Sequence, residues 1–390
     1  MPKLIYMDYH ATTPVDPRVL RAMQPYFLRC FGNAASSHAA GNKARKAVEA
    51  ARGEVAAFIG AKAHEIIFTS GATEANNMAI KGVAEACREK GSHFITVTTE
   101  HKSVLDPFRR LEMSGCEVTC LGVGSDGLLD LARLEQSLRP DTVLVSVMLA
   151  NNEIGVLQPV AEAARLTHRK GALLHCDAAQ ALGKVPVDAG SLGADLLSFS
   201  AHKNYGPKGV GALYMRKSGQ PQVKVLPLLE GGGHETGYRS GTLNVPGIVG
   251  FGQACRLSHR LLAAESRRVR RLRDILWKLL SKRIKGCHLN GSPDKRLPHN
   301  LNISIEGVSA KELMRKLPFL AISSGSACLS SSAEASYVLK AIGVKEELRH
   351  SSLRFGLGRF TTNTEIETAA NSIEKAVQAL RSATAKDSLS

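Results

Sequence analysis

The stretch ALLHCDAAQALGKVPVDAGSLGADLLSFSAHKNYGPKGVGALYM, residues 172–215, contains the pattern that decides the fold. It holds three short apolar runs, at 172–177, 195–200 and 210–215, separated by segments that contain Gly, Pro and Asp. Short and nearly continuous apolar runs are typical of strands that are buried on both faces of a sheet. We therefore expect three strands here, with polar side chains gathered where the strands end.

The same pattern extends toward the N-terminus. Four more apolar runs occupy residues 65–70, 93–98, 117–122 and 142–149. Helical patterns lie between several of the runs, at 74–90, 103–114, 129–138 and 159–170. Strands that alternate with helices predict an α/β fold, with a mostly parallel seven-stranded sheet flanked by helices.

The pattern changes after about residue 250. A long amphipathic helix over 256–285 is followed by strand patterns at 300–305 and 352–358 and helical patterns at 311–316 and 364–383. This order predicts a second, smaller α+β domain. We expect a large domain over 14–255, a small C-terminal domain over 256–390, and an N-terminal segment, 1–13, that packs with the small domain.

Composition and charge exclude several classes of protein. The 390 residues are 44% hydrophobic and 22% charged, which rules out a disordered or collagen-like chain. The formal net charge is +16, and residues 256–285 hold eleven Lys and Arg against two acidic residues. We interpret this basic stretch as a solvated helix face; attraction of an acidic partner is the alternative, and no nucleic-acid-binding signature accompanies it.

We also expect that the protein neither spans a membrane nor is secreted. The longest apolar stretch, 143–150, is far shorter than the roughly 20 residues of a membrane helix. The start, MPKLIYMDYH, lacks the pattern of a secretory signal, so a soluble cytoplasmic protein is expected. The eight cysteines form no CxxC pair, which argues against a metal site, and the run 117–122 predicts that Cys116 and Cys120 are buried thiols of a strand.

Polar residues at four strand ends indicate the chemistry. Ligands of open α/β sheets bind outside the carboxyl ends of the strands. The segment TSGATE (69–74) leads into a helix and can bind an anion there, although a simple capping box is the alternative. Asp177 ends another run, and His101 and Lys203 follow two more. A lysine for a Schiff base, a carboxylate for the pyridine nitrogen and a cup for the phosphate are what pyridoxal 5'-phosphate requires.

These residues occur within an ordered set of motifs that resembles a known family. The motifs are YMDYHATTP (6–14), FTSGATEANN (68–77), TEHKSVLD (99–106), NNEIGVLQP (151–159), HCDAAQALGK (175–184), SFSAHKNYGPKGVGALY (198–214), GGGHETGYRSGT (231–242), SSGSACLSSS (323–332) and SSLRFGLGRFTT (351–362). Together they resemble the cysteine desulfurases of the NifS/IscS type, which are class V aminotransferase-like enzymes of pyridoxal phosphate fold-type I. The resemblance runs from residue 6 to about residue 383.

The resemblance implies a role for each matching residue. Lys203 would form the Schiff base, Asp177 would pair with the pyridine nitrogen, and His101 would stack on the ring and move protons. Asn152 and Arg354 would receive the substrate carboxylate. The implied cofactor contacts are Ala72, Thr73, His101, Asn152, Asp177, Gln180, Ser200, His202, Lys203 and Thr242. Thr242 resembles a phosphate contact that comes from the neighbouring subunit, which implies a homodimer.

Cys328 differs from the other cysteines because it lies among small residues, within the segment 323–337. Small flanking residues offer no apolar surroundings, which favours a reactive thiol. The resemblance implies that Cys328 takes the sulfur of L-cysteine as a persulfide and leaves L-alanine. It also implies delivery of sulfur to an acceptor or iron–sulfur scaffold protein, with transient iron–sulfur ligation by Cys328 as the sole metal contact.

Two alternatives belong to the same fold, namely a selenocysteine lyase and a transaminase-like enzyme; a basic binding protein is a third, of a different class. Three departures from the family pattern are visible. Ala34 stands where proline is usual, His10 replaces a small polar residue, and the chain ends in RSATAKDSLS without the extended tail that housekeeping members use for scaffold docking. Scaffold delivery is therefore a weaker expectation than desulfurase chemistry.

Overall fold

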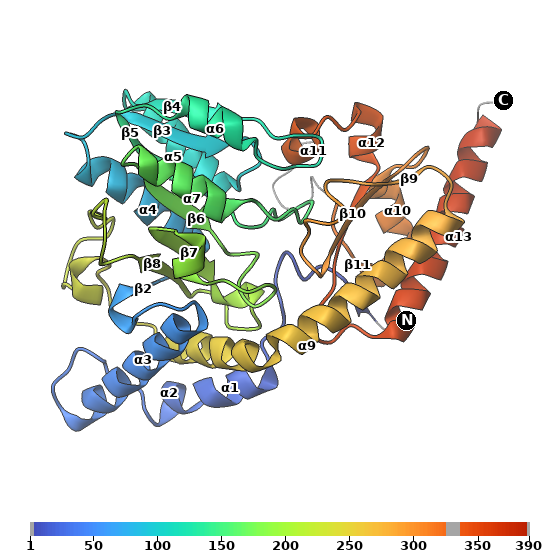
Figure 1. The fold of residues 1–390 in the computed structure, drawn as a ribbon. Helices are drawn as coiled ribbons and strands as arrows, with labels where there is room; N and C mark the ends of the chain where they lie inside the picture. Colours follow the sequence, from blue (N-terminus) through green and yellow to red (C-terminus); the bar gives the residue numbers. More distant parts are fainter. Residues whose placement is uncertain (1–3, 325–335, 388–390) are drawn as a thin grey trace.

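The computed structural model describes residues 4–324 and 336–387, and its centre is the seven-stranded sheet in Figure 1. The strand order is β2-β8-β7-β6-β5-β3-β4. Strand β8 runs antiparallel to both of its neighbours, and all other pairs are parallel. Each strand lies within one of the seven predicted runs: β2 (Ile66–Thr69), β3 (His93–Val97), β4 (Glu117–Leu121), β5 (Thr142–Ser146), β6 (Leu173–Asp177), β7 (Leu196–Ser200) and β8 (Gly211–Met215). The predicted mostly parallel sheet is confirmed.

Helices cover both faces of the sheet, as predicted. One face packs against α3 (Ala39–Phe58), α6 (Leu131–Ser137) and α7 (Val160–Arg169), and the other against α4 (Ala72–Ala86) and α5 (Lys102–Met113). Neighbouring strand residues point to opposite faces, so Ile66 and Phe68 belong to the first core and Ile67 to the second. The shorter helices of this part are α1 (Pro17–Met23), α2 (Pro25–Leu28) and α8 (Ala189–Leu192).

The two longest departures from the predicted helices concern α3 and α9; the short helices α1, α2 and α8 were not predicted either. Helix α3 was not predicted, and α9 (Val245–Arg283) begins at Val245 rather than at residue 256. The cause is close helix packing: a Cβ on Gly252 would lie 2.7 Å from Cα of Ala51 in α3, and a Cβ on Gly250 would lie 2.6 Å from Sδ of Met23. Glycine and alanine permit this contact but weaken the apolar periodicity that signals a helix.

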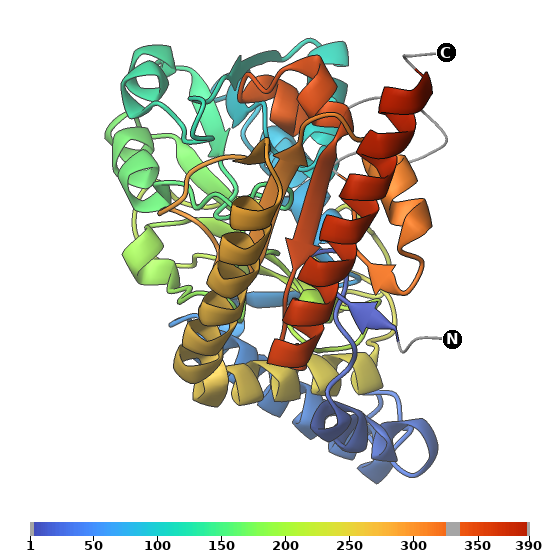
Figure 2. The same cartoon turned by 90° about the vertical axis from the view of Figure 1, so that its right-hand side faces the viewer.

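A smaller part of the structure forms around a second sheet. Strand β10 (Asn300–Ile305) lies between β9 (Cys287–Leu289) and β12 (Ser352–Gly356), and all are antiparallel. Apolar residues from α9, α10 (Ala310–Lys316) and α13 (Asn363–Asp387) cover it, and Figure 2 shows α9 and α13 side by side. The remaining helices are α11 (Tyr337–Ala341) and α12 (Glu346–His350).

The N-terminal segment packs into this smaller part. Strand β1 (Ile5–Tyr6) pairs with β11 (Leu320–Ala321), and Ile5 and Met7 join the core formed by α9, β10 and α13. Helix α9 contributes to both cores, with residues up to Cys255 in the first and Val269 to Leu280 in the second. The proposed domain boundary between residues 255 and 256 therefore falls within one continuous helix.

The expectation for the thiols of the run 117–122 was wrong in part. Cys120 is exposed and Cys116 is half-buried. The reason is that β4 is an edge strand, which among the described residues pairs with β3 alone, so its side chains have a neighbouring strand on one side only. In contrast, α9 is amphipathic as predicted: Leu272 and Leu276 are buried, whereas Arg271 and Lys278 are exposed. Across residues 4–324 and 336–387, no helix has the length and apolar character to span a membrane.

A buried ion pair ties α3 to the loop that precedes α9. Arg52 donates from Nη1 and Nη2 to the two carboxylate oxygens of Glu235, each at 2.7 Å. The Glu235 carboxylate also accepts from the backbone N–H of Phe68 in β2, and its side chain is 1% exposed. Removal of one partner from such a pair leaves an uncompensated buried charge.

We expect Glu235→Ala to lower the free energy of unfolding by about 3–5 kcal/mol, because the buried Arg52 guanidinium would keep only Glu49, whose side chain is 56% exposed, as a counter-ion. The matched control is Glu85→Ala, which removes the partner of Arg88 in an exposed pair. That change should cost less than about 1 kcal/mol. Urea unfolding of both variants makes the comparison, and equal losses would contradict the structural role of the buried pair.

Candidate active site

The predicted site residues meet in one cavity at the carboxyl ends of the parallel strands. Asp177 is the last residue of β6, Ser200 is the last residue of β7, and Lys203 follows in the 3-10 helix 201–203. The cavity has a volume of about 540 Å³, within the range of cofactor sites. Ten predicted residues line it: Ala72, Thr73, His101, Asn152, Asp177, Gln180, Ser200, His202, Lys203 and Arg354.

Two predicted residues do not line this cavity. Thr242 is exposed on the surface of its own chain. Cys328 lies outside the residues that the structure describes.

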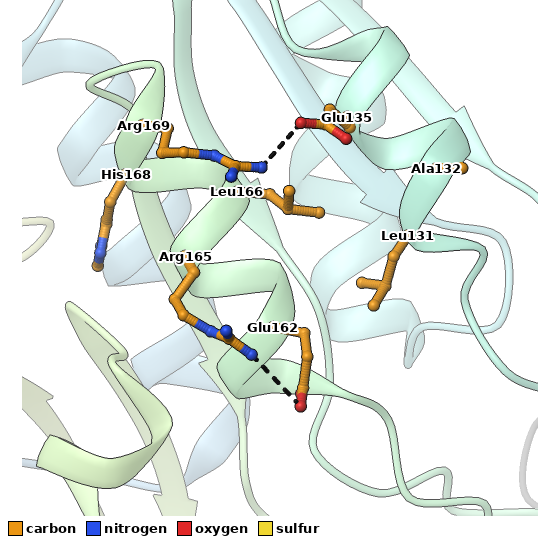
Figure 3. A pocket seen from close by; sticks show the side chains of 8 residues that line it. All are labelled: Leu131, Ala132, Glu135, Glu162, Arg165, Leu166, His168 and Arg169. Carbon is orange, nitrogen blue, oxygen red and sulfur yellow. Dashed lines mark hydrogen bonds and ion pairs between the residues drawn. The ribbon is translucent and has the colours of Figure 1, made fainter.

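A larger hollow, of about 840 Å³, lies between α6 and α7 (Figure 3). Its charged groups pair with one another: Arg169 Nη2 lies 2.8 Å from Glu135 Oε1, and Arg165 Nη2 lies 3.6 Å from Glu162 Oε1. None of the predicted site residues lines it. Volume alone therefore does not identify the active site, and the converging polar groups do.

The Asp177 carboxylate is buried and held by two donors. Its Oδ2 accepts from Asn76 Nδ2 at 2.8 Å, and its Oδ1 accepts from the backbone N–H of Ala179 at 2.9 Å. Asn76 also donates to Oγ of Ser103, at 2.8 Å. Hydrogen bonds compensate a buried carboxylate for the water that it loses, so these two donors hold the Asp177 side chain in place.

The same network fixes the proton on His101. The backbone N–H of Ser103 donates to His101 Nδ1 at 3.1 Å, and Ser103 Oγ lies 2.8 Å from the same nitrogen. Nδ1 is therefore an acceptor, and the neutral ring carries its proton on Nε2. Burial and the charge of Lys203 lower the pKa of His101, which favours this neutral form. His101 thus offers Nε2–H as a donor group.

The cavity wall beside the N-terminus of α4 suits an anion. The N-cap residue, Gly71, has no side chain that could bond the first turn of α4. The backbone N–H groups of that turn are therefore available to a ligand. A Cβ on Gly211 would lie 2.6 Å from Cα of Gly71, so glycine lets β8 approach this turn closely. Lys203 and Lys208 line the same cavity, and they and burial lower the pKa of His202 to about 4.

Arg354 is held at another wall of the cavity, in β12. Its Nη2 lies 2.9 Å from Asp8 Oδ1, and its Nη1 donates to the backbone carbonyl of Asn152 at 2.9 Å. The Asn152 side-chain oxygen is buried and has no hydrogen-bond partner within residues 4–324 and 336–387. The Arg354 guanidinium can receive a carboxylate, whereas the Asn152 oxygen can only accept a hydrogen bond from a donor group.

The described residues on both sides of 325–335 are anchored near this wall of the cavity. Ser323 exchanges backbone hydrogen bonds with Arg354. Ser336 donates from its hydroxyl to the carboxylate of Glu153, whose pKa burial raises to about 7. Tyr337 donates from its hydroxyl to the backbone carbonyl of Glu100 at 2.7 Å. The described residues on either side of 325–335 therefore lie beside cavity-lining residues or their chain neighbours.

Several supporting residues were missed by sequence reasoning. Asn76, Ser103 and Asp8 contact predicted site residues, although only their motifs had been noticed. His10, which had been noticed as a departure without a role, contacts Gln180. Asn76 and Ser103 follow strand ends within FTSGATEANN and TEHKSV, so their position was the one available signal.

Comparison with known proteins supports the resemblance. Residues 5–368 match the family described as aminotransferase class V. A protein named cysteine desulfurase IscS from Anaeromyxobacter sp. (strain Fw109-5) is 55% identical over 378 residues, which cover 97% of this chain and 93% of that protein. One of the same name from Methylococcus capsulatus is 52% identical, with the same coverage. A solved structure described as a NifS-like protein superposes with a TM-score of 0.90 at 37% identity, covering 96% of this chain and 99% of that one. The chain therefore belongs to the class V aminotransferase family, among the cysteine desulfurases of the NifS/IscS type.

Proposed function

We propose that this protein is a pyridoxal phosphate-dependent cysteine desulfurase, which converts L-cysteine to L-alanine and passes the sulfur to Cys328 as a persulfide. The observation that carries the proposal is the convergence of Lys203, Asp177 and His101 in one cavity with an anion-binding end. Family membership and the ordered motifs support it independently.

The residues of the cavity fit pyridoxal phosphate. The N-terminus of α4, with Ala72, Thr73, Ser200 and His202, would hold the phosphate. Asp177, held in place by its two donors, would pair with the pyridine nitrogen in its protonated form. When bound, the cofactor supplies an electron sink for the carbon that loses its proton.

The other steps of the reaction would depend on side chains of the protein. The Lys203 amine would attach the cofactor and, once displaced by the substrate amine, take the proton from the substrate carbon. His101 would present its Nε2–H as the donor of a hydrogen bond or a proton. Arg354, oriented by Asp8, would bind the substrate carboxylate together with Asn152.

Sulfur transfer falls to Cys328. The Cys328 thiolate would attack the substrate sulfur, the carbon–sulfur bond would break, and the carbon would gain a proton to give the methyl group of alanine. Cys328 follows Ser324 by four residues, a length of chain that spans at most about 14 Å. Because Ser323 is paired with Arg354 at the cavity wall, such a length is compatible with attack on a substrate bound there.

We further propose a homodimer in which Thr242 completes the partner's phosphate site. Thr242 is exposed and outside the cavity of its own chain, while the nearby Arg239 donates to Glu74 at the start of α4, at 2.9 Å. The proposed setting is the cytoplasm, whose reducing conditions keep the required thiol free. The persulfide would supply an acceptor protein, iron–sulfur scaffolds included.

Cys328→Ser should separate cofactor chemistry from sulfur transfer. The visible absorption of the bound cofactor should still respond to L-cysteine, because the cavity residues are unchanged. Protein-bound sulfane sulfur and alanine release should both fall by at least about 100-fold, because a serine hydroxyl is far less acidic than a thiol. Absorption spectra measure the response of the cofactor to L-cysteine, and trapping of labelled sulfur measures the sulfur transfer.

The matched control is Cys120→Ser, which changes an exposed thiol on the edge strand β4. It should leave both measurements at the wild-type level. If Cys328→Ser still released alanine at the wild-type rate, the assignment of the acceptor thiol would be wrong.

Hybrid dimers test the shared site. Dimers that combine a Lys203→Ala chain with a Thr242→Ala chain should contain one site with both residues intact, because each site takes Lys203 and Thr242 from different chains. Such hybrids should recover about half of the wild-type turnover and cofactor content. The two homodimeric variants are the controls, and hybrids no more active than these would refute the shared site.

A further inference from the structure

His10 is a buried histidine that joins the N-terminal segment to the cavity and to β10. It is 1% exposed and lines the cavity. Its Nδ1 lies 3.1 Å from Oε1 of Gln180, and its Nε2 lies 3.0 Å from Nδ2 of Asn300. Its ring stacks on that of His299, with 4.3 Å between the ring centroids.

Only one assignment of donors and acceptors satisfies these contacts. The backbone carbonyl of His10 can only accept, so the Gln180 group 3.1 Å from it is the amide nitrogen. Gln180 Oε1 then faces His10 Nδ1, which must carry the proton. His10 Nε2 must therefore accept from Asn300 Nδ2.

An arginine fixes the other end of this series of hydrogen bonds. Arg296 donates from Nη1 to Asn300 Oδ1 at 2.9 Å, and Asn300 Nδ2 also donates to the backbone carbonyl of Glu153. A guanidinium has no acceptor, so the amide of Asn300 cannot be reversed. Arg296 therefore fixes the orientation of the Asn300 amide, which in turn makes His10 Nε2 an acceptor and His10 Nδ1 the donor to Gln180.

His10 keeps this state because it stays neutral. Burial and the charges of Arg354, Lys203 and Lys184 lower its pKa well below the usual value. Gln180 uses one amide hydrogen for the His10 carbonyl, which leaves the second hydrogen for a ligand. Gln180 can thus present an N–H donor to the cavity.

We propose that His10 is a positioning residue: through its Nδ1–H it fixes the Gln180 amide so that an N–H group faces an oxygen of the bound cofactor. The proposal rests on the proposed function, since it takes pyridoxal phosphate as the occupant. It assigns a role to the residue that departs from the small polar side chain expected at this position.

The test compares two His→Phe changes in adjacent stacked rings. His10→Phe keeps an aromatic ring against His299 but removes the donor to Gln180. His299→Phe is the control, because neither ring nitrogen of His299 has a hydrogen-bond partner among the described residues. Apoprotein of each variant is titrated with pyridoxal 5'-phosphate, and the dissociation constant and absorption maximum of the bound cofactor are measured.

His10→Phe should weaken cofactor binding about tenfold and move the absorption maximum, because the Gln180 amide loses its orientation. His299→Phe should stay within about twofold of wild type. Equal affinities and spectra for His10→Phe and wild type would overturn the proposal. Failure of the wild-type protein itself to bind pyridoxal phosphate would instead refute the proposed function.

His10→Asn provides a rescue, because its amide can donate where Nδ1–H did although the ring is lost. It should bind the cofactor within about threefold of wild type, even if the melting temperature of the apoprotein falls. If His10→Phe does not fold, this variant carries the test. A tenfold loss of affinity in His10→Asn would show that His10 acts by packing alone and would overturn the proposal.

Discussion

A carboxylate at the end of a fully buried strand is the constraint on which the site depends. Asp177 closes β6, whose five residues are all buried, and an ionised group there is costly unless donors satisfy it. Asn76 from α4 and the backbone of Ala179 supply these donors. Asn76 also reaches Ser103, which orients His101, so the satisfaction of one buried charge organises three strand ends.

The central sheet could be predicted because each strand carries its own signal. Runs such as 142–149 and 195–200 are rich in apolar residues, since helices cover both faces of the strands. The start of α9 and the whole of α3 could not be predicted in this way. Their signal depends on close packing of Gly252 against Ala51, which is a contact between distant parts of the chain.

The candidate site, like the fold, has parts that the sequence could predict and parts that it could not. Its principal residues could be named because strand ends are ligand sites in this class of fold, and because motif resemblance supplied their roles. The residues that orient them could not, because contacts such as Asp8 with Arg354 and His10 with Asn300 join residues far apart in the sequence. His10 had no explanation from sequence, and the hydrogen bonds on both sides of its ring provide one.

The identity of the reactive lysine is the central claim, and covalent mapping tests it directly. Borohydride reduction of the holoenzyme would fix the carbonyl of bound pyridoxal phosphate to the amine that holds it, and peptide mass spectrometry would locate that amine. The account predicts a single pyridoxyl group per chain, on Lys203. A label on another lysine, or no label in protein that turns over cysteine, would contradict it.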